Sequence, residues 1–312
     1  MTAPTHISQP GGDRLFRALT LTAALAVPLL MLGILAALIN GSHLALGEFG
    51  FRFLTSLSWN PVTEKFGALS SIYGTVVSTL LALVIAVPMG LVIALFLVEL
   101  APPGLSAFFG SAIELLAAVP SIIYGMWGLF ILAPWMADHI QPALGGALGF
   151  LPLFKGPPMG IGMLSAGIIL ALMILPYISS VAREVFAMVP AVMKESAYGL
   201  GATSWEVTRG VTIRYALQGL VGAGFLGLGR ALGETMAVTF VIGNNHRISP
   251  SLFAPGNTIA STLANEFTEA SEPLYLSSLV ALGLVLLVIT VIFQILALFW
   301  LNRLRRAGGR PR

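Results

Sequence analysis

The chain lacks cysteine and is poor in charge. Without cysteine it has no disulfides, no thiolate nucleophile and no thiolate metal site. Only 9% of its 312 residues are charged, against roughly 25% in an ordinary soluble domain. Its 4 histidines lie apart, without the spacing of metal ligands, so we expect no zinc or catalytic histidine site. None of its lysines stands in a GxxxxGK[ST] motif, which excludes a phosphate-binding loop for ATP in this chain.

Hydrophobic residues, in contrast, make up 57% of the chain and gather in long runs. A helix needs about 20 apolar residues to cross the hydrocarbon core of a bilayer. The first run, of about 22 residues, is longer than the core of a signal peptide, so we interpret it as a retained span. We therefore expect an all-α, polytopic membrane protein with six transmembrane helices: Ala18–Ile39, Ile72–Leu97, Phe108–Ala133, Ile161–Val181, Leu217–Ile242 and Leu274–Leu301.

The basic residues indicate how these spans are oriented. If the N-terminus is cytoplasmic, the inside segments hold Arg14, Arg17, Arg183, Lys194, Arg209, Arg214, Arg303, Arg305, Arg306, Arg310 and Arg312. The outside segments then hold only Arg52, Lys65, Lys155 and Arg247. The positive-inside rule thus predicts that both termini are cytoplasmic. The expected organisation is a tail (1–17) that is polar and disordered, a transmembrane domain (18–301) containing a cytoplasmic loop (182–216), and a basic tail (302–312).

The cytoplasmic loop is the main polar interruption between two apolar segments. We predict two short helices in it. Pro190 suits the first position of one helix, and Gly199 suits the left-handed residue that ends it. Thr203 and Glu206 have the spacing of a capping box that starts the second helix. Such a helix–turn–helix on a membrane surface favours a docking element over a plain connecting loop, because ordinary connections are shorter.

The fifth predicted span contains two charges near its middle, Arg230 and Glu234. Each costs at least about 2.5–3.5 kcal/mol at that depth, so both should face protein or water. Four residues apart on a helix, they can form an ion pair. One interpretation is a helix that lines a translocation path, with Arg230 attracting an anion; the other is a neutral pair that fastens two helices. Beside them, small residues repeat at four-residue spacing and allow close approach of another helix: Gly219, Ala223, Gly227 and Ala231.

The predicted outer segments hold many of the remaining aromatic and acidic residues. They are residues 40–71, 152–158 and 243–273. These segments can receive a soluble partner, although polar loops are expected in any membrane protein. No internal repeat is evident, so the inverted-repeat signature of many secondary transporters is not seen.

Several stretches resemble one family. KESAYGLGATSWEV (194–207) resembles the EAA loop of ABC importer permeases, with Ser196 in place of the usual Ala. Together with ELLAAVPSIIYGMWGL (114–129), GLGRALGETMAVTFVIGN (227–244) and PGNTIASTLANEF (255–267), it makes the chain similar to the C-type permease subunits of the phosphate (Pst) ABC importer. The likeness extends from about residue 14 onward.

The resemblance implies a type I ABC importer permease (MetI-like) fold in the bacterial inner membrane. It implies four kinds of partner: a second, PstA-like permease; a PstB-like ATPase dimer, which binds ATP and Mg; an external PstS-like phosphate-binding protein; and inorganic phosphate itself. By the same resemblance the chain is not an enzyme, holds no cofactor or metal, and contacts the lipid bilayer but no nucleic acid.

The resemblance also implies roles for particular residues. Arg230 and Glu234 match charged residues of the family's path, and Glu114 in the third span joins them, able to meet Arg183 or Arg230 or to reach water. The coupling positions are Glu195, Ser196, Ala197 and Gly201. The expected function is passage of phosphate through paired permeases, driven by ATP hydrolysis in a separate chain. The alternatives are a sulfate or molybdate permease, an ion-coupled secondary transporter, and a membrane scaffold that transports nothing.

Overall fold

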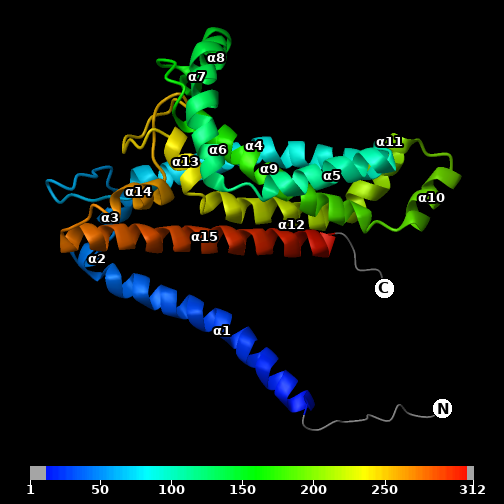
Figure 1. Cartoon of the computed structure of the whole chain (residues 1–312), viewed down its shortest axis with the longest axis horizontal. Coiled ribbons are helices and arrows are strands. Elements are labelled where there is room, and N and C mark those ends of the chain that lie inside the picture. Colours follow the sequence, from blue (N-terminus) through cyan, green and yellow to red (C-terminus); the bar gives the residue numbers. More distant parts are fainter. Residues whose placement is uncertain (1–11, 308–312) are drawn as a thin grey trace.

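The computed structural model describes residues 12–307, and this part of the chain is helical, without a β-sheet. Its centre is a bundle of three long helices, α4 (Leu69–Leu95), α9 (Met163–Ala187) and α12 (Ile213–Leu232). They run side by side along the longest axis of the molecule (Figure 1). The largest group of buried apolar side chains lies between these helices and the short helix α13 (Met236–Val241).

Small residues allow α4 and α9 to approach closely. The face of α4 toward the core has mainly Gly, Ala, Ser and Thr, including Ala82, Ala86, Gly90 and Ala94. A Cβ atom on Gly90 would lie 3.1 Å from Cγ2 of Ile178 on α9. In a bilayer, where lipid is as apolar as the helix surface, such close backbone packing is what holds helices together.

The small-residue stripe predicted on the fifth span has the expected role. A Cβ atom on Gly219 would lie 2.6 Å from Cγ1 of Val185, and one on Gly227 would lie 2.7 Å from Cδ1 of Ile178. Ala223 and Ala231, the other two residues of the stripe, are also buried. The stripe therefore packs α12 against α9, and the prediction is confirmed.

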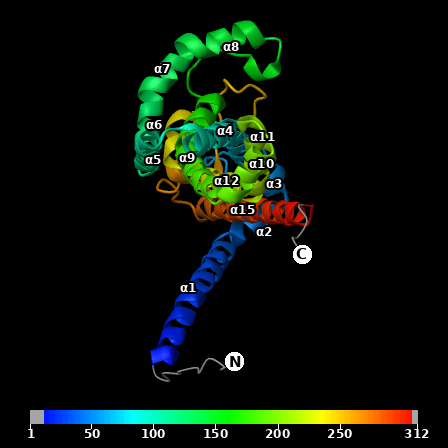
Figure 2. The ribbon, with the colours of Figure 1, turned by 90° about the vertical axis from the view of Figure 1, so that its right-hand side faces the viewer.

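The third predicted span, Phe108–Ala133, is wrong as a single straight helix. Helix α5 (Pro103–Ala117) is followed by helices that run from Ser121 to Leu148 and bend away from it by 90°. The break lies before Pro120, whose ring has no N–H to donate and disfavours a helical conformation in the preceding residue. The sequence α6 (Ser121–Trp127), η2 (Gly128–Leu132), α7 (Ala133–Trp135), η3 (Met136–Ile140) and α8 (Gln141–Leu148) forms an arm that curves around the bundle (Figure 2).

The fifth predicted span, Leu217–Ile242, is also broken. Helix α12 ends at Leu232, residues 233–235 are not helical, and α13 begins at Met236. On its other side the helix extends back through η5 (Thr208–Thr212) to α11 (Ser204–Val207). The polar loop thus leads directly into the core helix.

Several short helices and the long helix α15 complete the described chain. Between α1 (Gly12–Gly41) and α4 lie α2 (His43–Phe49) and α3 (Arg52–Thr55). Helix η4 (Pro152–Phe154) follows α8, and α14 (Ile259–Glu266) precedes α15 (Pro273–Ala307). Phe53, Phe66 and Tyr275 are buried in a second apolar cluster, between α2, α3, the start of α4 and α15. The predicted outer segments are therefore packed structure as well as polar loop.

Helix α1 (Gly12–Gly41) diverges from the bundle and meets α15 only near its own C-terminal end (Figure 1). It has no buried residue, and it begins at Gly12, so residues 12–16 are helical although the sequence predicted disorder before Arg17. Residues 1–11 and 308–312 of the predicted tails lie outside the described range. Within residues 12–307, five helices are long and apolar enough to cross a membrane, or six if the bent pair counts as one span.

The bundle has two chemically different ends. Helices α2, α3, α13 and α14 lie at one end, and α10 (Ala191–Gly199) with α11 lies at the other (Figure 1). The first residue of α1 and the last residues of α15 point toward the end that holds α10. The two ends of the described chain and the predicted docking loop thus share one side of the protein.

Candidate functional site

Arg230 lies in the last turn of α12, on a face that this chain alone leaves exposed. Its guanidinium carbon stands 5.9 Å from the centre of the Tyr177 ring on α9. That distance permits a cation–π contact, and the nitrogen atoms of the side chain stay available to an anion. The sequence had indicated Arg230 but not Tyr177, because a tyrosine within an apolar run has no distinguishing pattern.

Glu234 does not pair with Arg230, contrary to the prediction. Because α12 ends at Leu232, the two residues are not one turn apart on a single helix, and no ion pair joins them among the described side chains. Instead, Oε1 of Glu234 accepts a hydrogen bond from the backbone N–H of Ala237, 3.1 Å away, at the start of α13. A carboxylate there also has a favourable interaction with the helix dipole. Glu234 therefore stabilises the break, and Arg230 keeps its positive charge uncompensated.

Glu114 takes one of the three positions that its sequence left open. Its Oε1 lies 2.6 Å from Nη2 of Arg183, so α5 is joined to α9 by an ion pair. Arg183 crosses directly over Gly110, where an added Cβ would lie 1.7 Å from its Nη1 atom. The Glu114 side chain is 57% exposed, so the pair lies at the surface of this chain, and Glu114 forms no ion pair with Arg230 among the described residues. The structure does not bring Glu114 and Arg230 together.

The predicted docking loop is a helix followed by a tight turn. Helix α10 begins at Ala191, with Pro190 as its N-cap, one residue later than predicted. Glu195 and Ser196 are exposed, and Ala197 is half-buried. Around them the loop presents large apolar side chains to solvent: Val192, Met193, Tyr198 and Leu200, the last 90% exposed. An apolar surface with an exposed carboxylate has the composition of a protein interface more than that of a plain connection.

The turn depends on Gly201 and not on Gly199. Gly199 is still helical, whereas Gly201 has a φ of +84°, a conformation that side chains with a Cβ rarely adopt. The assignment of the left-handed residue to Gly199 was therefore wrong by two positions. The capping box is confirmed: the Thr203 N–H donates to Glu206 Oε2 at 2.8 Å, and the Glu206 N–H donates to Thr203 Oγ1 at 3.4 Å.

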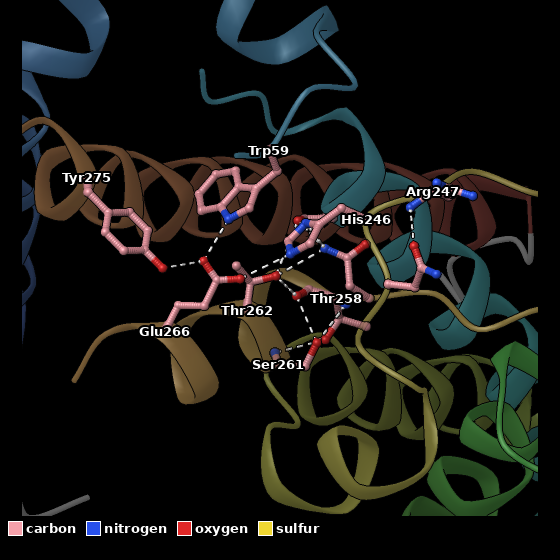
Figure 3. Close-up of polar contacts among 11 residues, drawn as sticks. Trp59, His246, Arg247, Thr258, Ser261, Thr262, Glu266 and Tyr275 are labelled. Atoms are coloured by element: carbon pink, nitrogen blue, oxygen red, sulfur yellow. Dashed lines mark hydrogen bonds and ion pairs between the residues drawn. The ribbon is translucent and has the colours of Figure 1, made fainter. Parts of the chain in front are cut away.

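At the opposite end, Glu266 organises a polar network that the sequence did not indicate (Figure 3). Its carboxylate accepts hydrogen bonds from Trp59 Nε1 at 2.6 Å and Tyr275 OH at 2.7 Å, and it lies 3.0 Å from His246 Nε2. Burial opposes ionisation of Glu266, but these hydrogen bonds outweigh it and place its pKa below the ordinary value. Asn257 extends the network from His246 to Ser71 on α4. Two of the outer segments, 40–71 and 243–273, are thereby joined to each other and to the start of α15.

Comparison with known proteins identifies the family of this chain. A scan against models of protein families gives no match. Among curated proteins, the chain is 57% identical over 301 residues to the phosphate transport system permease protein PstC of Mesorhizobium japonicum, covering 95% of this chain and 92% of the relative. It is 52% identical over 318 residues to the protein of the same name from Xylella fastidiosa, covering 98% of both chains. The chain belongs to the PstC family.

Solved structures agree on the fold. A subunit of a bacterial alginate ABC transporter, in complex with a periplasmic protein that holds an alginate pentasaccharide, aligns with a TM-score of 0.62 at 15% identity. The alignment covers 97% of this chain and 99% of that subunit. A second alginate ABC transporter structure gives 0.60 at 16% identity, covering 94% and 99%. The PstC-family chain therefore has the predicted all-helical fold of an ABC importer permease and is a multi-pass membrane protein.

Proposed function

We propose that this chain is the transmembrane permease subunit of an ATP-driven importer of inorganic phosphate. The observation that supports it most is membership of the PstC family over nearly the whole chain, combined with an exposed arginine, without an ion-pair partner among the described residues, at the break that ends α12. Phosphate is an anion, and a guanidinium is the side chain best suited to bind it through two parallel hydrogen bonds.

The path for phosphate is not enclosed by this chain alone, since Arg230 is exposed. A second permease, PstA-like, covers that face in the proposed importer, so that phosphate passes between the two subunits. Arg230 attracts the anion there. Glu234 holds the first turn of α13 and adds negative charge near the path, which keeps binding weak enough for release. Glu114 acts at a distance, by fixing α5 against Arg183 on α9.

Energy comes from outside the chain. A PstB-like ATPase dimer binds ATP and Mg and receives helix α10, with Glu195, Ser196, Ala197 and the Gly201 turn at the contact. Because α11 continues into α12, movement of this loop is transmitted along the helix that bears Arg230. A PstS-like protein delivers phosphate to the opposite end, where α2, α3, α14 and the Glu266 network form the surface.

This arrangement fixes the proposed orientation. The protein lies in the bacterial inner membrane with both termini and α10 in the cytoplasm, where ATP is found. The support is the excess of arginine and lysine in the segments on that side and the shared position of the described chain ends and α10.

The proposal is tested in a bacterium whose own C-type permease gene is deleted. Expression of this chain is expected to restore uptake of radiolabelled phosphate at low external concentration, and unlabelled sulfate or molybdate in excess should leave that uptake unchanged. Restored sulfate or molybdate uptake without phosphate uptake would show that the substrate is one of these oxyanions and not phosphate. Unchanged transport of all three would refute the proposal.

A further inference from the structure

Glu99 is a largely buried carboxylate close to docking helix α10. It lies in η1 (Phe96–Leu100), a turn of π-helix at the end of α4, and its side chain is only 13% exposed. Lys194, on the docking helix α10, places its Nζ atom 2.5 Å from Glu99 Oε1, and the lysine side chain is 19% exposed. Such a sheltered pair is screened by salt far less than a pair on an open surface.

The same carboxylate oxygen reaches a third element. Thr212, which is fully buried at the end of η5, donates from Oγ1 to Glu99 Oε1 at 3.4 Å. Oγ of Ser106 on α5 also donates to the backbone oxygen of Leu97 in η1, at 2.8 Å. Two turns of π-helix thus meet at one carboxylate, and that carboxylate is bonded to the docking helix. Single π-turns within α-helices are frequent at functional sites.

We propose that Glu99 is a positioning residue that joins docking helix α10 to the adjoining ends of α4 and α12. When the ATPase moves α10, Lys194 transmits the displacement through Glu99 to η1 and so to α4. The chain itself transmits it through α11 and η5 to α12. The two core helices that contact α9 then move together. The inference rests on the proposed function, because it assigns a route for force that only an ATPase-driven permease needs.

The link between Glu99 and Lys194 depends on the negative charge of Glu99, which can be removed without changing the packing of the core. A neutral glutamine at position 99 keeps the size of the side chain but loses the charge that holds Lys194. The apolar contacts between α4 and α9, which involve Ala82, Ala86 and Gly90, are unaffected. Loss of coupling with retained assembly is therefore expected.

The test uses the complete importer, with its partner permease, ATPase and binding protein, reconstituted in proteoliposomes. The measured quantity is phosphate imported per ATP hydrolysed. Glu99→Gln is expected to lower this ratio on the order of fivefold or more, the lower end of ordinary coupling between sites, while ATP hydrolysis without binding protein stays unchanged. The matched control is Glu184→Gln, which removes an exposed carboxylate of α9 that takes part in none of the ion pairs among the described residues. It should leave the ratio unchanged.

Exchange of the two charges tests whether the ion pair between Glu99 and Lys194 itself is needed for coupling. Glu99→Lys and Lys194→Glu should each lower the ratio, and the double variant should restore most of it. An unchanged ratio in Glu99→Gln, or a double variant no better than the single ones, would overturn the inference. If Glu99→Gln does not assemble, Lys194→Gln is measured in its place, and a wild-type ratio there has the same consequence. If the wild-type importer shows no ATP-dependent uptake, the proposed function itself fails, which is a distinguishable result.

Discussion

Replacement of Arg230 by glutamine removes an exposed positive charge in the last turn of α12. The variant keeps a polar side chain of similar length but cannot neutralise an anion. A hydrogen bond to a charged group contributes about 1.5–3 kcal/mol, and every 1.4 kcal/mol is a factor of about ten. If Arg230 contacts phosphate during passage, uptake should fall about 10- to 100-fold.

The structure also predicts that this variant folds. Arg230 is exposed, makes no ion pair among the described residues and touches Tyr177 only through a contact worth about 0.5–1 kcal/mol. Purified complexes should therefore contain the variant in normal amount and unfold within a few degrees of wild type. Arg230→Lys keeps the charge without the planar fork, so an intermediate rate is expected.

The assay is the initial rate of radiolabelled phosphate uptake, divided by the amount of complex in the membrane. Arg17→Gln, on helix α1 away from the bundle, is the control for loss of an arginine and should transport normally. Wild-type uptake by Arg230→Gln at normal abundance would refute the role of Arg230. Loss of the complex from the membrane would instead show that the residue is structural.

Three further outcomes follow from the geometry. Gly201→Asp should uncouple ATP hydrolysis from uptake, because position 201 has a left-handed backbone. Gly199→Ala should leave coupling unchanged, because a Cβ there would meet open space. Equal coupling in both variants would contradict the role of the Gly201 turn in docking. Gly74→Ala should destabilise the complex by about 1–3 kcal/mol in thermal unfolding, since its Cβ would lie 1.7 Å from a backbone oxygen, while Gly47→Ala should have little effect. Because the pKa of Glu266 is depressed in the folded protein, its ionised form stabilises the fold above the ordinary pKa of 4.5, and this stabilisation is lost as pH falls through the lower folded-state pKa. The stability advantage of wild type over Glu266→Gln should therefore shrink on acidification. A pH-independent difference would argue against the network.

The sequence predicted those features that depend on local chemistry. Apolar runs gave the membrane class, the spacing of Thr203 and Glu206 gave the capping box, and the four-residue repeat on α12 gave its packing against α9. The resemblance in the docking loop and in the fifth span gave the family, which the relatives confirm.

The breaks in two spans were not predicted, because each span was treated as one continuous apolar run long enough to cross a bilayer. Proline disfavours a helix at the residue before it, but the 90° angle at Pro120 depends on how the arm packs on the bundle. The break after Leu232 separated Arg230 from Glu234 and invalidated the expected ion pair. Tertiary contacts between distant segments, such as those of Glu99 and Glu266, leave no periodic signal in a single sequence.

The proposal that this chain belongs to an ATP-driven phosphate importer is tested by phosphate uptake into proteoliposomes that contain it with its candidate permease partner and ATPase. Binding protein is supplied outside and ATP inside, and each is omitted in turn. Uptake is expected only when both ATP and binding protein are present. Uptake by this chain alone, driven by an ion gradient and indifferent to ATP and binding protein, would contradict the proposal and identify a secondary transporter.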